Sequence, residues 1–246
     1  MIFERICIII RKLTIIGRII ILKTKIITIE GIDGSGKTVQ YGLLSKALEE
    51  RGFTVAQRSY PVYDSYFGGQ VGRYLSAADG DRATDVDQRS MALWFAMDRF
   101  MDLRDFVDGE ADFLLLNRYV LSNAVYQSIR DRDLGKPDIV DWVFDLEYNV
   151  LGLPRPDLNL FFDVEPERAG INVDNKGFRS YVGKGRDVYE SSKPMQQRAR
   201  EKYTEIANRY GDTVIVTCGK GKAMLPPEEI AEKVIRILIE RGILES

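Results

Sequence analysis

The sequence contains no histidine in its 246 residues. Without histidine the chain cannot form a Ser-His-Asp or Cys-His catalytic centre, and it cannot hold a metal through imidazole. Cysteine is almost as scarce, because Cys7 and Cys218 are the only two. Two cysteines so far apart do not form a disulfide framework, which favours a protein of the reducing cytoplasm. The run "TVIVTC" predicts that Cys218 is a small buried residue at the end of a strand.

The chain also lacks an excess of charge of either sign. Its formal net charge is −2, so no overall field attracts nucleic acid or a membrane surface, and any anion site must be local. Hydrophobic residues make up 45% of the sequence and charged residues 29%, which is ordinary for a globular protein. The length suits one α/β domain with a substantial core.

The isoleucine-rich N-terminus lacks an uncharged run long enough to span a membrane. The stretch "MIFERICIIIRKLTIIGRIIILK" also has no uninterrupted apolar core and no small-residue cleavage site of a signal peptide. Wound as a helix it would carry a basic stripe beside an isoleucine face, which suits a membrane surface, but so many β-branched residues form a weak helix. We interpret residues 1–24 as an extension outside the fold, from a poorly ordered tail or a mistaken start codon. The organised domain is expected over 25–246.

Apolar runs alternate with amphipathic segments along this domain. The predicted strands are residues 26–30, 53–59, 112–116, 157–164 and 213–218. The predicted helices are residues 37–51, 70–77, 86–107, a helix from about 120, then 138–151, 191–210 and 226–242. Such alternation predicts an α/β fold of three layers, a five-stranded parallel sheet with helices on both faces. The glycine- and charge-rich segment 165–190 is interpreted as a lid.

The first predicted strand leads into a phosphate-binding loop. Residues Gly31-Ile32-Asp33-Gly34-Ser35-Gly36-Lys37-Thr38 match G-x-x-x-x-G-K-[ST] at every fixed position, between a strand and a helix. In such a P-loop the backbone N–H groups converge on phosphate oxygens, the lysine reaches the β- and γ-phosphates, and the threonine hydroxyl ligates Mg²⁺. The residues predicted to bind ATP are Gly31, Asp33, Gly34, Ser35, Gly36, Lys37, Thr38 and Val39. The sequence shows no N-K-x-D motif after a strand, which argues against a GTPase.

Segments around the P-loop extend this pattern over nearly the whole domain. They are "IEGIDGSGKTVQ", "YPVYDSYFGGQVGRYL", "WFAMDRF", "NRYVLSNAVYQ", "GLPRPDLNLFFDVEPE" and "YVGKGRDVYE". In this order the chain resembles the thymidylate kinases, which are P-loop nucleoside-monophosphate kinases. The resemblance implies phosphoryl transfer from ATP to dTMP, giving dTDP and ADP, with Mg²⁺. It also implies a cytoplasmic homodimer, with no nucleic-acid partner.

The resemblance assigns roles around the acceptor nucleotide. Asp33 would accept a hydrogen bond from the sugar 3′-OH, and Arg118 would hold the acceptor phosphate in its guanidinium fork. Phe95 and Arg99 lie four residues apart and share a helix face. By resemblance Phe95 stacks on thymine, Arg99 bonds the carbonyl edge of the base, and Tyr126 crowds the sugar 2′ position. The further acceptor residues by resemblance are Ser122, Asn123, Gln127 and Tyr189.

The lid segment carries the cations Lys176, Arg179, Lys184 and Arg186. The P-loop has no arginine of its own, whereas phosphoryl transfer requires cations at the equatorial oxygens of the transferred group. A basic lid that closes over ATP would supply them, as in the bacterial form of the family. Lys184 and Arg186 are therefore the candidate catalytic cations, beside Lys37 and Arg118.

The match departs from the family at several positions. Asn117 ends the strand "FLLLN" where an aspartate would hold Mg²⁺, so we expect it to act through water, with Glu30 or Asp163 as compensating carboxylates. The proline loop carries Tyr63 where the family often has an arginine, and Arg73 on the next helix is the candidate replacement for that cation. Val39 replaces the small hydroxyl residue that usually follows Thr38.

Two alternatives stay open at this point. A kinase of the same fold would act on another monophosphate such as dUMP or dCMP. A protein that kept its nucleotide pockets but lost turnover would only bind nucleotide, and Asn117 is the residue that motivates this reading. Phe95, Arg99 and Tyr126 favour a thymine-like base on a deoxy sugar, and the intact P-loop with Arg118 favours an enzyme.

Overall fold

The computed structural model describes residues 24–77, 80, 82–174, 189, 193–220 and 223–245. Its centre is a parallel sheet of five strands in the order β2-β3-β1-β4-β5. The strands are β1 (Lys25–Glu30), β2 (Val55–Ser59), β3 (Phe113–Asn117), β4 (Leu158–Asp163) and β5 (Thr213–Thr217). All four strand pairings are parallel, which confirms the predicted fold class.

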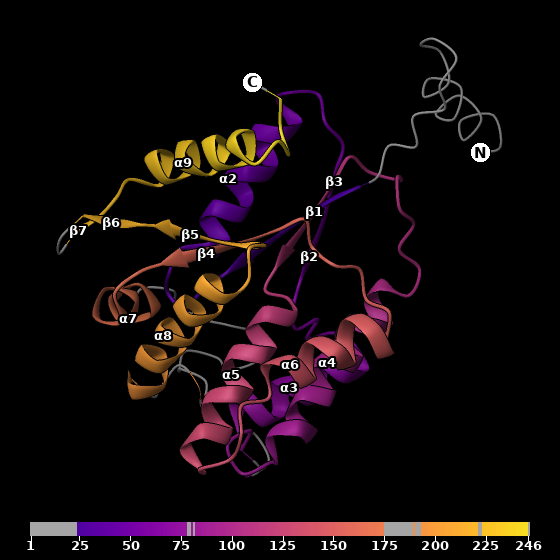
Figure 1. Cartoon of the computed structure of the whole chain (residues 1–246), viewed down its shortest axis with the longest axis vertical. Coiled ribbons are helices and arrows are strands. Elements are labelled where there is room, and N and C mark those ends of the chain that lie inside the picture. Colours follow the sequence, from indigo (N-terminus) through magenta and orange to yellow (C-terminus); the bar gives the residue numbers. More distant parts are fainter. Residues whose placement is uncertain are drawn as a thin grey trace.

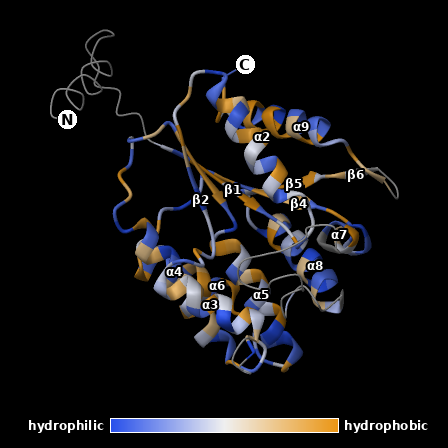
Figure 2. Ribbon diagram, turned by 180° about the vertical axis from the view of Figure 1, so that it is seen from behind, coloured by the Kyte–Doolittle hydropathy of each residue, from blue (hydrophilic) through white to orange (hydrophobic). Residues whose placement is uncertain are grey.

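The central strands are apolar on both faces because helices cover both faces. Ile27 and Ile29 of β1, Leu115 of β3, and Leu160 and Phe161 of β4 are completely buried. Figure 2 shows the hydrophobic colouring concentrated in the strands, whereas the helices carry hydrophilic residues on their outer sides. The sheet is therefore the rigid layer from which the connecting loops project.

Figure 1 shows the two helical layers. Helices α2 (Lys37–Glu49) and α9 (Pro227–Glu240) pack against each other on one face of the sheet. The other face carries α3 (Tyr66–Ser76), α4 (Gln88–Leu103), α5 (Val120–Asp133), α6 (Val140–Phe144) and α8 (Lys193–Arg209). Helix α7 (Pro166–Asp174) follows β4, and a short hairpin of β6 (Gly219–Lys220) and β7 (Ala223–Met224) follows β5. No helix in the described part of the chain is both long and apolar enough to cross a membrane.

Several predicted elements differ from the structure. The single helix expected over 138–151 is α6 followed by a π-helix, η1 (Asp145–Val150). Helix α3 begins four residues earlier than expected, because the Ser65 side chain caps it by accepting a hydrogen bond from the Gly68 N–H at 2.9 Å. The segment predicted as a lid begins with a regular helix, α7, and the β6-β7 hairpin was not predicted.

The start of the folded domain also needs a small correction. Thr24, which the sequence analysis placed in the extension, is completely buried. Its N–H donates to Asp108 at 2.8 Å, its hydroxyl donates to the Ala111 carbonyl at 2.8 Å, and the hydroxyl accepts from the Gly109 N–H at 2.8 Å. These bonds tie the residue before β1 to the loop before β3. The remainder of the predicted extension lies outside the described residues.

Candidate active site

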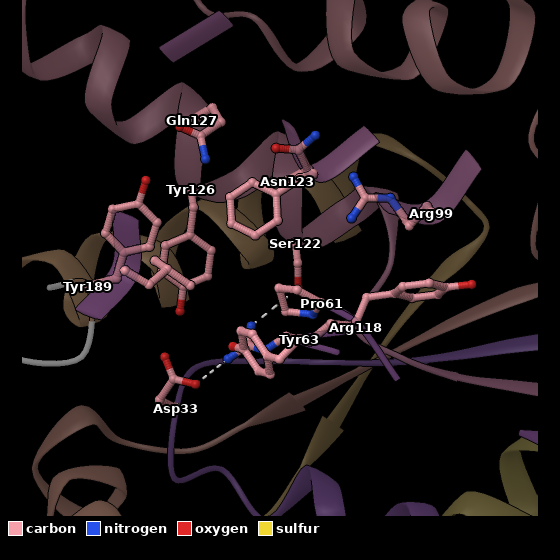
Figure 3. Close-up of a pocket in the computed structure, with 13 residues that line it drawn as sticks. Asp33, Pro61, Tyr63, Arg99, Arg118, Ser122, Asn123, Tyr126, Gln127 and Tyr189 are labelled. Carbon is pink, nitrogen blue, oxygen red and sulfur yellow. Dashed lines mark hydrogen bonds and ion pairs between the residues drawn. The ribbon is translucent and has the colours of Figure 1, made fainter. Parts of the chain in front are cut away.

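The carboxyl ends of β1, β2 and β3 bring the predicted acceptor residues to one edge of the sheet. A cavity of about 90 Å³ lies there (Figure 3). Its lining residues are Asp33, Tyr60, Pro61, Tyr63, Leu75, Phe95, Arg99, Arg118, Ser122, Asn123, Tyr126, Gln127 and Tyr189. We call it the acceptor cavity. It collects every predicted acceptor residue except Arg73, which lies on the exposed side of α3 and does not line it.

Arg118 and Asp33 join the P-loop to the acceptor cavity. The Arg118 guanidinium forms an ion pair with the Asp33 carboxylate, and its Nη1 donates to the Ser122 hydroxyl at 3.3 Å. Arg118 has a φ of 62°, in the left-handed region that favours glycine. Burial opposes its charge, but the Asp33 carboxylate together with Tyr126, Tyr203 and Glu30 raises the pKa of Arg118 well above its ordinary value. The guanidinium is thus a fixed cation at the floor of the cavity.

Glu30, at the end of β1, lies completely buried behind this pair. Its carboxylate accepts from the Tyr119 N–H at 2.7 Å, the Ser122 hydroxyl at 2.5 Å and the Tyr203 hydroxyl at 3.1 Å. Burial raises its pKa, although these donors and Arg118 oppose the shift. Because both carboxylate oxygens are bonded to the protein, Glu30 is a structural anchor here and a poor substitute for a metal-binding aspartate.

The far end of the cavity from Asp33 holds Arg99 and Asn123 (Figure 3), and Phe95 also lines the cavity. Arg99 is almost fully buried, and its Nε and Nη2 each donate to Glu147 at 2.6 Å. Burial works against the charge of Arg99, but Glu147 more than offsets it and raises the pKa of the guanidinium. Glu147 was not found by sequence analysis. A glutamate on the helical segment 138–151 carries no local signal for a contact with residue 99.

Aromatic and amide side chains close the other wall. The rings of Tyr126 and Tyr189 stack with centroids 5.6 Å apart and an interplanar angle of 10°. The side-chain carbonyl of Gln127 accepts a hydrogen bond from Arg130 Nη1 at 2.8 Å. The Gln196 amide, which the sequence analysis missed, donates to the Tyr189 carbonyl at 3.0 Å and accepts from the Asp33 N–H at 3.1 Å. Gln196 therefore couples this wall to the P-loop.

The P-loop itself forms a close-packed cradle. Gly34 has a φ of 82°, and a Cβ placed on it would lie 1.9 Å from the Ala169 carbonyl oxygen. At Gly31 a Cβ would lie 2.9 Å from the Phe162 carbonyl oxygen, so both positions require glycine. The Lys37 ammonium donates to the carbonyls of Gly31 at 2.9 Å and Ile32 at 2.6 Å. Residues of this loop thus match the predicted phosphate cradle in conformation.

A second cavity, of about 520 Å³, adjoins the P-loop on the side of α7 and the β6-β7 hairpin; we call it the donor cavity. It is lined by Asp163, Val164, Glu165, Glu167, Arg168, Ile171, Arg200, Thr217, Cys218, Gly219, Ala223 and Met224. Asn172 of α7 donates to the Gly34 carbonyl at 2.8 Å, which holds the cavity wall on the loop. The sequence analysis named only Asp163 and Cys218 of this set.

Asp163 and Cys218 both line the donor cavity, and contacts within the protein hold each side chain. The Asp163 carboxylate pairs with Arg200, whose Nε and Nη2 lie 2.5 and 3.1 Å from its two oxygens. Cys218 is buried as predicted, its thiol donates to the Val216 carbonyl at 3.1 Å, and burial raises its pKa to about 12. The thiol is therefore protonated at neutral pH, and neither side chain resembles a reactive nucleophile.

The residues that could hold Mg²⁺ with a nucleotide are few. Thr38 is exposed at the first turn of α2, with its neighbour Val39. Asn117 donates through Nδ2 to the Ser59 hydroxyl at 3.0 Å, and its buried Oδ1 has no partner among the described residues. No cluster of three or more acidic or cysteine side chains suited to a metal occurs in the described part of the chain. The donor set fits a magnesium ion that arrives with phosphate oxygens and water.

The predicted lid cations Lys176, Arg179, Lys184 and Arg186 lie outside the described residues. Of the segment "YVGKGRDVYE" the structure describes Tyr189, which is buried in the wall of the acceptor cavity.

The P-loop follows the first strand, and a cavity lies across the same sheet edge beside a partly buried arginine that follows the third strand. Together these features define a P-loop kinase of small phosphorylated substrates. The chain matches the thymidylate kinase family over residues 29–230. Two strains of Mycobacterium tuberculosis have a thymidylate kinase 34% identical over 186 residues, covering 74% of this chain and 85% of theirs. A probable thymidylate kinase of Methanothermobacter thermautotrophicus is 34% identical over 75% of this chain and 82% of its own.

A solved structure of thymidylate kinase from Candida albicans has the same fold, with a TM-score of 0.67 at 22% identity over 90% of this chain and 93% of that one. The chain therefore belongs to the thymidylate kinase family, whose members are kinases that use ATP. The predicted family and enzyme class are confirmed.

Proposed function

We propose that this protein transfers the γ-phosphoryl group of ATP to dTMP, giving dTDP and ADP. The observation that carries the proposal is the position of Asp33, which belongs to the P-loop and also lines the acceptor cavity beside Arg118. A nucleotide on the P-loop and a monophosphate on Arg118 would place their phosphates next to each other. The family relationship supports thymine as the base of that monophosphate.

In the proposed complex the acceptor phosphate meets Arg118, and the sugar lies beside Asp33 and Tyr126. The base reaches the far end of the cavity, where Phe95 stacks on it and Arg99 donates to its carbonyl edge. Ser122, Asn123, Gln127, Tyr63 and Tyr189 complete the proposed enclosure. The existing Arg118–Asp33 ion pair keeps the guanidinium in place before the phosphate arrives.

The donor phosphates occupy the P-loop, and the donor nucleoside occupies the donor cavity. The volume of that cavity supports this placement, and so does the hydrogen bond by which Asn172 of α7, a helix that lines the cavity, holds the Gly34 carbonyl of the P-loop. Lys37 now bonds two carbonyls of the loop. We expect its ammonium to exchange these contacts for the β- and γ-phosphate oxygens when ATP binds.

Transfer is proposed as a direct in-line displacement with no covalent enzyme intermediate. The protein positions the two nucleotides and neutralises charge through Lys37, Arg118 and the lid cations Lys184 and Arg186. Magnesium bound with ATP supplies further charge neutralisation, and we assign Thr38 to it directly and Asn117 through water.

We further propose a cytoplasmic homodimer whose kinase domain includes the buried Thr24 and the residues from 25 onward. The exposed apolar side chains Tyr66 of α3 and Leu93 and Met101 of α4 support a subunit contact on this helical layer.

The proposal is tested by ADP release from ATP·Mg²⁺ with dTMP, dUMP, dCMP and UMP supplied separately. We expect dTMP to give the fastest turnover. Arg118→Met should lose most of this turnover, because it removes the phosphate-binding cation. The control is Arg236→Met, which replaces an exposed arginine on α9 and should behave as wild type. If another monophosphate gave the fastest turnover, the kinase assignment would stand, but thymine would be rejected as the preferred base. Nucleotide binding without turnover of any acceptor would favour a binding protein, the alternative that Asn117 motivates.

A further inference from the structure

The orientation of the Asn123 amide is determined by its neighbours. Its Nδ2 donates to the Ala92 carbonyl at 3.0 Å and to Glu147 Oε1 at 2.8 Å. Neither a backbone carbonyl nor an ionised carboxylate has a hydrogen to donate, so both can only accept hydrogen bonds. Rotating the amide by 180° would place Oδ1 against two acceptors, so only one orientation satisfies the contacts.

The Asn123 carbonyl oxygen is consequently turned away from these two groups. Asn123 is 3% exposed, and its Oδ1 has no hydrogen-bond partner among the described residues. The residue lines the acceptor cavity at the same end as Arg99 (Figure 3). A buried acceptor without a partner is costly unless a ligand supplies a donor.

The same Glu147 carboxylate holds Arg99 through two bonds of 2.6 Å. Glu147 is completely buried and does not itself line the cavity. It lies in the π-helix η1, and such wide turns occur frequently at functional sites. One carboxylate thus fixes a donor, Arg99, and an acceptor, Asn123, side by side at the end of the cavity.

We propose that Glu147 is a positioning residue that makes the acceptor cavity select thymine or uracil and reject cytosine. The proposal rests on the proposed function. Thymine presents O4 as an acceptor and N3–H as a donor, which match Arg99 and the Asn123 carbonyl. Cytosine presents an amino group and an unprotonated N3 at these positions, so both contacts are reversed.

Glu147→Gln is the variant that tests this role. It keeps the shape of the side chain but introduces an NH₂ group, which must face Arg99 together with Asn123 at the Oε1 position or Arg99 alone at the Oε2 position. In place of Oε1 the NH₂ group opposes the donors of both Arg99 and Asn123, and in place of Oε2 it opposes Arg99 Nε. Arg99 loses an acceptor in both arrangements. The donor that matches O4 of thymine is then no longer held in place, which removes part of the preference for thymine over cytosine.

The measurement is kcat/KM for dTMP, dCMP and dUMP with wild type and variant. We expect Glu147→Gln to lower the dTMP:dCMP ratio by roughly 10- to 100-fold, because a site built to hydrogen-bond one partner pays for leaving that group unpaired. The dTMP:dUMP ratio should stay within about twofold, since these bases share the same hydrogen-bonding edge.

Two further variants separate positioning from stability. Lys202→Met removes another buried cation, which pairs with Asp138 and Glu205 outside both cavities, and it should lower the unfolding temperature with no change in either ratio. Glu147→Asp keeps a group that only accepts, and it should retain most of the selectivity that Glu147→Gln loses.

An unchanged dTMP:dCMP ratio in Glu147→Gln, with wild-type turnover led by dTMP, overturns the inference and leaves the proposed function intact. Absence of wild-type turnover rejects the proposed function, and the ratio of dTMP to dCMP dissociation constants then tests the inference instead. Should Glu147→Gln fail to fold, the wild type still decides the matter. Its Asn123 side-chain NH₂ resonances, assigned by their loss in Asn123→Ser, should exchange slowly with solvent, and rapid exchange contradicts a fixed amide.

Discussion

Arg118 combines an unfavourable backbone conformation with a charged function. Its φ of 62° costs an ordinary side chain about 1–2 kcal/mol relative to glycine, yet an arginine stands there because its side chain reaches Asp33, Ser122 and the cavity. Backbone strain retained at one partly buried cation is expected where that cation has a task other than stability.

Arg118→Gly and Arg118→Ala separate the strain from the function. Both should lose at least about 100-fold in kcat/KM for the acceptor, because each removes the phosphate-binding cation. The glycine variant should be more stable than the alanine variant by about 1 kcal/mol, since only alanine keeps the strain. Urea unfolding and ADP release measure the two effects. Equal stability of the two variants would show that the left-handed conformation carries no cost.

Asn117 leaves the metal without a protein charge at the end of β3. Asn117→Asp should lower the Mg²⁺ concentration required for half-maximal turnover by roughly fivefold, corresponding to about 1 kcal/mol between a carboxylate and a cation that water screens from each other. It should also cost about 1–3 kcal/mol of unfolding free energy, because a charged oxygen would take the buried position of Oδ1, which has no partner among the described residues. Mg²⁺ titrations of ADP release and urea unfolding provide the test. An unchanged Mg²⁺ requirement would place the ion away from residue 117.

At the scale of elements, the parallel sheet was predictable because its strands are short apolar runs between helical segments. The P-loop was predictable because its glycines are local requirements of backbone conformation. The π-helix η1 and the contact of Glu147 with Arg99 were not, since they depend on packing between α4, α5 and η1. The β6-β7 hairpin was not predictable either, because strands of two residues leave almost no pattern in the sequence. The donor cavity, which this hairpin helps to line, was missed with it.

The proline loop after β2 is held in position by helix α4. Asp98 of α4 is almost fully buried and accepts from the Val62 N–H at 2.9 Å and the Ser65 hydroxyl at 2.8 Å. These two bonds position Pro61 and Tyr63 in the wall of the acceptor cavity. A substitution in α4 that touches no nucleotide should therefore alter acceptor binding.

Asp98→Ala should raise the KM for the acceptor several-fold with little change in the KM for ATP, and it should cost about 1–3 kcal/mol of stability. Asp87→Ala is the matched control. Asp87 caps the same helix by accepting from the Arg89 and Ser90 N–H groups, so its loss costs about 1 kcal/mol without reaching the loop. Steady-state kinetics with each substrate varied separately measure the two KM values. Equal changes in both KM values in both variants would contradict this view.

At the scale of the whole molecule, Glu30 connects the two layers that carry the site. It extends from β1 and bonds the backbone after β3, a hydroxyl of α5 and a hydroxyl of α8. One buried carboxylate therefore joins the sheet to the helical layer below the acceptor cavity. The folded state keeps this group at the cost of burying it, which makes the stability of the domain depend on pH.

The sign of that dependence follows from the raised pKa of Glu30 in the folded protein. Below the unfolded pKa of about 4.5 both states hold the proton, and the folded state keeps its full advantage. As the pH rises from there through the folded pKa, the unfolded state releases its proton first, so the wild type loses stability.

Glu30→Gln has no ionisable group at this position, so it lacks this pH-dependent loss of stability. Its deficit in unfolding free energy relative to wild type should therefore shrink between pH 4.5 and 8. Urea unfolding across this range, with exposed Glu228→Gln as the control for loss of one charge, tests the sign. A deficit that grows with pH would show that Arg118 and the three donors outweigh burial and hold the pKa of Glu30 below its ordinary value.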